Sequence, residues 1–207
     1  KAWGSSSGNV LLQIVFEGEE KHFYANKLDK VMMKIAVLLK QVPDLAEELE
    51  VDDSGKALDT EYIKFRLNEY DEHALEEAVS LKEAGQASEV TAIALDGEEV
   101  DKALFTAMAK GADKAIKLMG AEIEGSRAAA SLFAEAVGTE YDLIMTGVQS
   151  VDDREGMMGP MLSSMLKIPC LSVVTRVEGG DSSITVHKEY FGGLMAVFDV
   201  KMPAVLG

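Results

Sequence analysis

Residues 142–160 read DLIMTGVQSVDDREGMMGP, and the apolar run MLSSML follows them at residues 161–166. Residues 143–145 form a short continuous apolar run before a glycine, which is typical of a strand buried on both faces of a parallel sheet. From Met158 to Leu166 the apolar residues recur at helical spacing. The stretch therefore predicts a strand, an open loop and a helix that begins near Gly156.

The start of this helix is a candidate binding site. Its free N–H groups and the positive end of its dipole are expected to face the carboxyl end of the strand, where open α/β sheets bind ligands. A phosphate is the kind of anion that such groups hold. An ordinary strand-to-helix turn, with glycine for its backbone and aspartate for its cap, explains the same residues equally well.

The same alternation of strand and helix runs through the chain as far as Pro169. Apolar runs predict buried strands at residues 34–39, 90–95, 115–119 and 143–145. Between these strands, apolar residues recur at helical spacing, and glycines end the predicted helices. One helix begins at Asn68, which is its predicted cap, and Asp71 supplies negative charge in its first turn. The pattern predicts an α/β fold, a parallel sheet with helices on both faces.

The pattern changes after Pro169. Apolar segments at residues 171–177, 184–190 and 194–200 are separated by glycine pairs, which predicts antiparallel strands joined by turns. We expect this C-terminal part to be a meander on the sheet edge.

The composition limits the function. A chain of 207 residues with a net charge of −16 is long enough for one α/β domain, and its charge argues against nucleic acid or an anionic membrane as partner. A basic protein partner fits the charge better. The single cysteine, Cys170, excludes an intrachain disulfide. With no signal peptide or membrane span in the sequence, we expect a soluble, cytoplasmic protein.

Residues 1–31 stand apart from the alternating units. A Gly/Ser run at residues 4–8 is typical of a linker, and residues 10–16 with the turn at 17–19 predict a strand and a turn. We expect residues 1–31 to be an extension and residues 32–207 to be the main domain.

The first strand is followed by Lys40 to Asp44 and then by an acidic stretch to Thr60, and no glycine lies at its exit. A glycine-rich phosphate loop is therefore missing there, so any phosphate must be held elsewhere. The histidines His22, His73 and His187 lie in the extension, at a polar helix start and on an exposed strand, positions that do not favour catalysis. No catalytic residue or metal ligand set is predicted.

Several segments in series carry a resemblance to a known family. They are residues 34–44, 68–79, 103–113 and 147–160, then Val186 to Glu189, the pair Gly192–Gly193, and residues 201–205. In order and spacing, the chain from Met33 onward resembles the β subunit of electron transfer flavoprotein. This resemblance implies a Rossmann-like, doubly wound, mostly parallel sheet of the adenine-nucleotide-binding type, with the antiparallel meander at its C-terminal end.

The resemblance also implies a function. It implies a heterodimer with an α subunit whose FAD carries electrons between flavin dehydrogenases and an acceptor, while the β subunit itself holds AMP or, in electron-bifurcating relatives, a second FAD. Such a subunit is an electron carrier without catalytic residues of its own. By position, the family's nucleotide site falls on Leu38, Asn68, Glu69, Tyr70, Asp71, Leu95, Gly147, Val148, Gln149, Ser150, Val151, Asp152, Asp153, Arg154, Glu155, Gly156, Met157 and Met158.

The chain departs from the family pattern in three places. Relatives often carry a hydroxyl or amide side chain where this loop has Met157 and Met158, so backbone N–H groups must do more of the phosphate binding. Phe191 stands before the glycine pair where an acid is usual. The chain also stops at Gly207, before the arm that wraps the α subunit in the family, so we expect that arm to be lacking or cut off.

Two points stay open at this stage. Asp152 and Asp153 are expected to cap the loop or to reach ribose hydroxyls, because carboxylates aimed at a phosphate would repel it; a magnesium site is the weaker alternative. The second point is function, since the same fold also serves stand-alone adenine-nucleotide-binding modules of the stress or signalling type.

Overall fold

The computed structural model describes residues 10–16, 19–25, 32–46, 48–56, 58–61, 63–119, 125–180 and 182–207. The chain forms two compact units, Lys1–Val31 and Met32–Gly207. In the first unit, β1 (Val10–Phe16) pairs antiparallel with β2 (Glu19–Ala25). The strand predicted at residues 10–16 is thus confirmed, whereas the Gly/Ser run and residues 17 and 18 of the turn lie outside the described residues. That the first unit is an extension stays a prediction.

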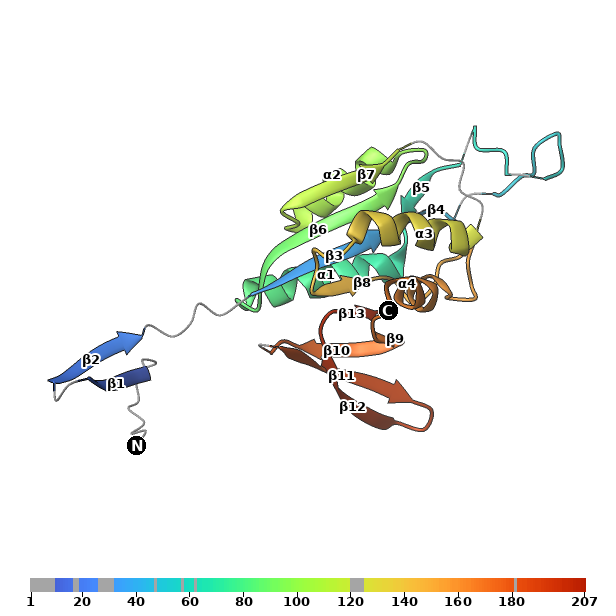
Figure 1. Ribbon diagram of the computed structural model, residues 1–207. Helices are drawn as coiled ribbons and strands as arrows, with labels where there is room; N and C mark the ends of the chain where they lie inside the picture. Colours follow the sequence, from blue (N-terminus) through green and yellow to red (C-terminus); the bar gives the residue numbers. More distant parts are fainter. Residues whose placement is uncertain are drawn as a thin grey trace. The chain divides into compact units, whose positions relative to one another are not determined.

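The second unit is built on a six-stranded parallel sheet (Figure 1). Its strands, in spatial order, are β7 (Lys114–Leu118), β6 (Ala87–Leu95), β3 (Met33–Leu39), β8 (Leu143–Met145), β13 (Ala204–Leu206) and β9 (Cys170–Leu171). Every neighbouring pair is parallel. The chain runs from β3 outward to β6 and β7, and then returns to the other side of β3 with β8. The sheet order therefore reverses between β3 and β8.

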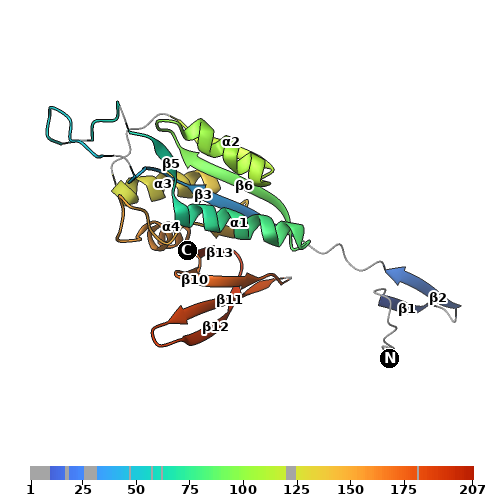
Figure 2. The same cartoon turned by 180° about the vertical axis from the view of Figure 1, so that it is seen from behind.

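Two layers of helices cover the sheet, one on each face (Figures 1 and 2). Side chains alternate along β3, so Ile35 and Val37 pack with α1 (Glu69–Glu83) and α2 (Val100–Lys110), while Ala36 and Leu38 pack with α3 (Gly125–Val137) and α4 (Met158–Leu166). The predicted α/β fold with a doubly wound parallel sheet is confirmed. Among the described residues, no helix has the length and apolarity to cross a lipid bilayer.

The C-terminal part contains the predicted meander, but its details differ from the prediction. The segment 171–177 is not one strand: the chain turns at Val173, where φ is +62°, between β9 and β10 (Val174–Glu178). Strand β10 then pairs antiparallel with β11 (Ser183–Tyr190), and β11 with β12 (Leu194–Lys201). These three strands form a separate sheet and do not extend the edge of the parallel one.

The chain then re-enters the main sheet as β13, between β8 and β9. The sequence analysis missed this strand, although residues 204–206, like the strand predicted at residues 143–145, form a short apolar run. The sequence analysis also missed a pair of short strands. β4 (Gln41–Pro43) pairs antiparallel with β5 (Phe65–Leu67), so the stretch after Lys40 begins as a strand.

The alternation along the central strands can be tested by truncating one isoleucine in the core and one at the sheet edge. Ile35 on β3 has no exposed surface, whereas Ile116 on the edge strand β7 is 36% exposed. We expect Ile35→Ala to lower the free energy of unfolding by about 2–5 kcal/mol, because it leaves a void in a packed core, and Ile116→Ala by less than about 1 kcal/mol. Urea denaturation measures both values. Equal losses would contradict the central position of β3.

Candidate functional site

A cavity of about 860 Å³ lies at the carboxyl ends of the parallel strands. Leu38 and Leu39 at the end of β3, Leu95 at the end of β6 and Thr146 just after β8 all line it. The cavity therefore sits where the sheet order reverses, between the exits of β3 and β8. The crevice at such a reversal is the usual ligand site of open α/β sheets, because the loops from the two strands run to opposite faces and leave a gap between them.

A buried carboxylate ties the two strand exits together. Asp71, in the first turn of α1, is 5% exposed; its Oδ2 accepts a hydrogen bond from Lys40 N and its Oδ1 one from Gly147 N, both at 2.8 Å. Burial raises the pKa of Asp71 to about 7, against the opposing effect of these bonds, a bond from Asn68 and the charge of Lys40. Asp71 thus lies in the first turn of its helix, as predicted, but it is buried there and connects the two strand exits.

Asn68 makes a second contact between α1 and the loop that follows β8. It occupies the N-cap of α1 as predicted, but its side chain makes no capping bond; Nδ2 donates instead to the carbonyl of Gln149 at 2.9 Å. The cap prediction is wrong in this respect, since the amide serves the loop rather than the helix. Gly147 is required at this contact, because a Cβ there would lie 2.3 Å from Asp71 Oδ1 and 2.9 Å from Asn68 Nδ2.

The first of the two adjacent acids, Asp152, is paired with a lysine. Lys40 Nζ lies 2.8 Å from Asp152 Oδ2, and Ser150 Oγ donates to Asp152 Oδ1 at 2.6 Å. Burial by itself would raise the pKa of Asp152, but the bonds from Lys40 and Ser150 and the charge of Lys40 outweigh it and hold this pKa below its usual value. Asp152 is therefore ionised at neutral pH and has its charge balanced within the protein.

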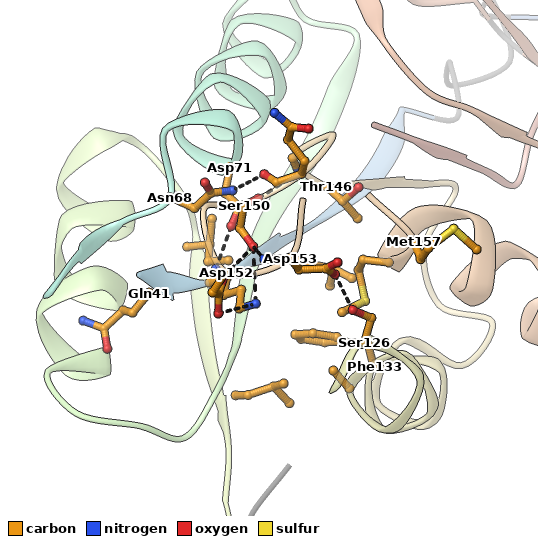
Figure 3. Close-up of a pocket in the computed structure, with 18 of the residues that line it drawn as sticks. Gln41, Asn68, Asp71, Ser126, Phe133, Thr146, Ser150, Asp152, Asp153 and Met157 are labelled. Atoms are coloured by element: carbon orange, nitrogen blue, oxygen red, sulfur yellow. Dashed lines mark hydrogen bonds and ion pairs between the residues drawn. The ribbon is translucent and has the colours of Figure 1, made fainter. Parts of the chain in front are cut away.

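The second acid, Asp153, connects the loop to the opposite helix layer. Its carboxylate accepts a hydrogen bond from Ser126 Oγ at the start of α3 (Figure 3). Its backbone N–H donates to Ser150 Oγ at 3.2 Å, and Ser150 N donates to the Asp153 carbonyl at 3.1 Å. The Asp152 side chain thus bonds within its own loop, as predicted for a cap, whereas the Asp153 side chain bonds to α3. Among the described residues, no cluster of three or more acidic, histidine or cysteine side chains could hold a metal ion.

Two helices begin at the cavity. The first residues of α3, Gly125 to Arg127, line one part of it, and Met157 and Met158 at the start of α4 line another. The first N–H groups of a helix have no partner within the helix, so each start presents donors and a positive dipole end. Phe133 and Met161 add apolar surface from the same two helices. The cavity thus joins an apolar floor to helix ends that favour an anion.

Most of the residues predicted for the site lie together at this cavity. Its lining includes Leu38, Asn68, Asp71, Leu95, Gly147, Val148, Gln149, Ser150, Asp152, Asp153, Glu155, Gly156, Met157 and Met158. Four others do not line it: Glu69, Tyr70, Val151 and Arg154, all of which are exposed. Tyr70 still borders the loop, because its OH accepts a hydrogen bond from Gln149 Nε2 at 3.5 Å.

Sequence reasoning missed part of the lining. The additional residues include Lys40, Gln41, Thr60, Phe65, Asp96, Gly97, Glu98, Ser126, Arg127, Phe133 and Thr146. Lys40, Asp96 and Thr146 each follow a predicted strand directly, so the rule that ligands bind at strand exits would have found them. The start of α3 carried no such signal, because only the fold brings it opposite the exit of β8.

Comparison with known proteins places the chain in one group. The family model described as "Electron transfer flavoprotein domain" matches residues 56–207. The chain is 33% identical over 180 residues to the electron transfer flavoprotein subunit beta of Methylophilus methylotrophus, covering 84% of this chain and 68% of that protein. It is 32% identical over 175 residues to the subunit of the same name from Dictyostelium discoideum, covering 84% of this chain and 70% of that protein.

The buried tie at Asp71 leads to a prediction about pH. The folded chain holds the Asp71 proton with a pKa of about 7, against 3.8 for an ordinary aspartate, so the free energy of unfolding contributed by this group falls as the pH rises between these values. Asp71→Asn carries no titrating proton. We therefore expect the stability of the wild type relative to Asp71→Asn to fall by about 2 kcal/mol between about pH 5 and about pH 7.5. Urea denaturation at the two pH values measures it, and a pH-independent difference would contradict the burial of the charge.

Proposed function

The chain belongs to the electron transfer flavoprotein family as a β subunit, and on that premise we propose that its cavity holds an adenine nucleotide, either AMP or a second FAD. In this proposal an α subunit pairs with the chain and carries the FAD that takes electrons from flavin dehydrogenases and passes them to an acceptor. The β subunit contributes a nucleotide site and a docking surface, without chemistry of its own.

The observation that supports nucleotide binding most directly is how the acidic side chains of the loop from Gly147 to Met158 are bonded. Its two adjacent acids are both engaged, one with Lys40 and one with Ser126, so they do not present free carboxylates to an incoming phosphate. The loop ends at the start of α4, where N–H groups and the dipole favour an anion. An anion can therefore approach this helix start even though the chain as a whole carries a charge of −16.

The rest of the cavity fits the remainder of such a ligand. Leu38 and Phe133 are buried apolar residues of the lining, and Leu95 and Met161 lie beside them. A flat purine packs on apolar side chains of this kind, while polar groups at the rim orient it. Asp96 and Glu98, which follow β6, also line the cavity and offer carboxylate oxygens for ribose hydroxyls.

The meander supports the proposed partner. The hairpin of β11 and β12 exposes five large apolar side chains: Tyr190, Phe191, Leu194, Met195 and Val197. Tyr190 and Leu194 are directly opposite each other across the two strands, and Phe191 at the turn is fully exposed. A concentration of apolar surface at one tip is typical of a protein–protein contact. We assign this hairpin tip to the interface with the α subunit.

The glycine of the loop gives the sharpest test of the nucleotide site. Gly156 has φ +63°, and a Cβ there would lie 2.5 Å from the carbonyl oxygen of Val148, so a side chain would displace the loop. We expect Gly156→Val to weaken AMP binding at least about tenfold, or 1.4 kcal/mol, in isothermal titration.

Gly85 provides the matched control for that variant. Its φ is +67°, but a Cβ there would meet no atom within 4 Å, and it lies after α1, outside the cavity lining. Gly85→Val should carry the same backbone strain and keep its affinity for AMP. If Gly156→Val stayed folded and bound AMP fully, while a change at Lys40 or Asp44 abolished binding, the phosphate would lie at the exit of β3.

The hairpin tip can be tested separately from the nucleotide. We expect the double substitution Phe191→Asp and Leu194→Asp to weaken association with the α subunit at least about tenfold, because it places two charges in an apolar contact. Co-purification and light scattering of the two-chain complex measure this. Val51→Asp, at another exposed apolar position, is the control and should leave the complex intact. Full association of the double variant would show that the partner binds elsewhere.

A further inference from the structure

Thr146 carries a buried hydroxyl to which the proposed function assigns no role. The residue is 5% exposed and lines the cavity, and its backbone N–H donates to the carbonyl of Leu206 at 2.9 Å. Its Oγ1, in contrast, has no hydrogen-bond partner in the described part of the chain. Buried hydroxyl groups are nearly always hydrogen-bonded to protein, water or a ligand in native proteins, so an unpartnered oxygen on a residue that lines a cavity makes that residue a candidate ligand contact.

The position of this hydroxyl relates it to the start of α4. Gly159 is in the first turn of α4, and a Cβ on Gly159 would lie 3.4 Å from Thr146 Oγ1. The same Cβ would lie 3.7 Å from Val205 and 3.8 Å from Cys170, so the helix rests directly on the sheet here. The absence of a side chain at Gly159 therefore brings the first turn of α4 close to the Thr146 hydroxyl. Figure 3 shows Thr146 between the α1 side of the cavity, with Asn68 and Asp71, and Met157.

The start of α4 supplies few hydrogen-bond donors to the cavity. Met157 and Met158 line it at the start of α4, and a thioether donates no hydrogen bond. Pro160, in the first turn, has no N–H either, so α4 presents fewer backbone donors than an ordinary helix start. The carboxylate of Asp153 in the loop accepts a hydrogen bond from Ser126. An anion bound here would need one more donor, and the unpartnered Thr146 hydroxyl can supply it.

We propose that Thr146 is a ligand contact whose hydroxyl donates a hydrogen bond to the phosphate at the start of α4, in place of the side-chain donors that Met157 and Met158 cannot supply. This inference rests on the proposed function, because it assigns one residue of that site to the phosphate of the nucleotide. Thr146 is then a specificity residue: it favours ligands with a phosphate over the same nucleoside without one.

The test compares AMP with adenosine as probes, titrated into the full chain after removal of bound nucleotide. Thr146→Val keeps the shape of the side chain and removes only the hydroxyl. We expect it to weaken AMP binding at least about tenfold and to leave adenosine binding unchanged, and we expect Thr146→Ser to bind AMP nearly as well as the wild type.

Thr91→Val is the matched control. Thr91 on β6 is also fully buried, but it does not line the cavity, so this variant should bind AMP normally and shows the effect of losing a buried hydroxyl as such. A folded Thr146→Val that binds AMP like the wild type would overturn the proposal. Equal losses for AMP and adenosine would also overturn it, since they would show an effect on the loop and not on the phosphate. A wild-type chain that binds AMP, adenosine and FAD equally poorly would overturn the proposed function, and this contact with it.

Discussion

The buried carboxylate of Asp71 is the contact on which the site depends. It joins three elements that are far apart in sequence, the exit of β3 at Lys40, the first turn of α1 and the exit of β8 at Gly147. Placing a carboxylate in this position is unfavourable, as its raised pKa shows, and the hydrogen bonds that it accepts and the charge of Lys40 offset only part of the effect of burial. The protein keeps it because the two strand exits frame the cavity, and the tie prevents them from separating.

The same constraint explains which residues the loop can contain. Gly147 has no room for a side chain beside Asp71 and Asn68, and Gly156 has none beside the carbonyl of Val148. Between these two glycines, Asp152 pairs with Lys40 after β3, and Asp153 accepts a hydrogen bond from Ser126 on α3. The loop is therefore closed by its own contacts before any ligand arrives, and it leaves the start of α4 open to an anion.

The proposed function divides between two parts of the second unit. The cavity at the reversal of the sheet combines apolar lining residues with a helix start, the two features that the proposed nucleotide site uses. The meander, whose inner face packs on the α1 side of the core through Val177, Ile184 and Val200, exposes an apolar hairpin tip. The cavity and the exposed apolar hairpin tip together fit the role that we propose for this β subunit of an electron carrier.

The sequence by itself determined the fold class and the family. Apolar runs such as 34–39 and 143–145, with helical stripes between them, were sufficient to predict the parallel sheet, because these patterns record burial locally. The loop from Gly147 to Met158 was identified for the same reason, and the electron transfer flavoprotein resemblance is confirmed by the comparisons. Only the tertiary structure decided how distant residues meet: that Asn68 serves the loop and not its helix, that Ser126 faces Asp153, and that β13 returns to the middle of the sheet. These contacts join residues separated by tens of positions, and a local pattern holds no information on which strand exit a side chain will face once the sheet has formed.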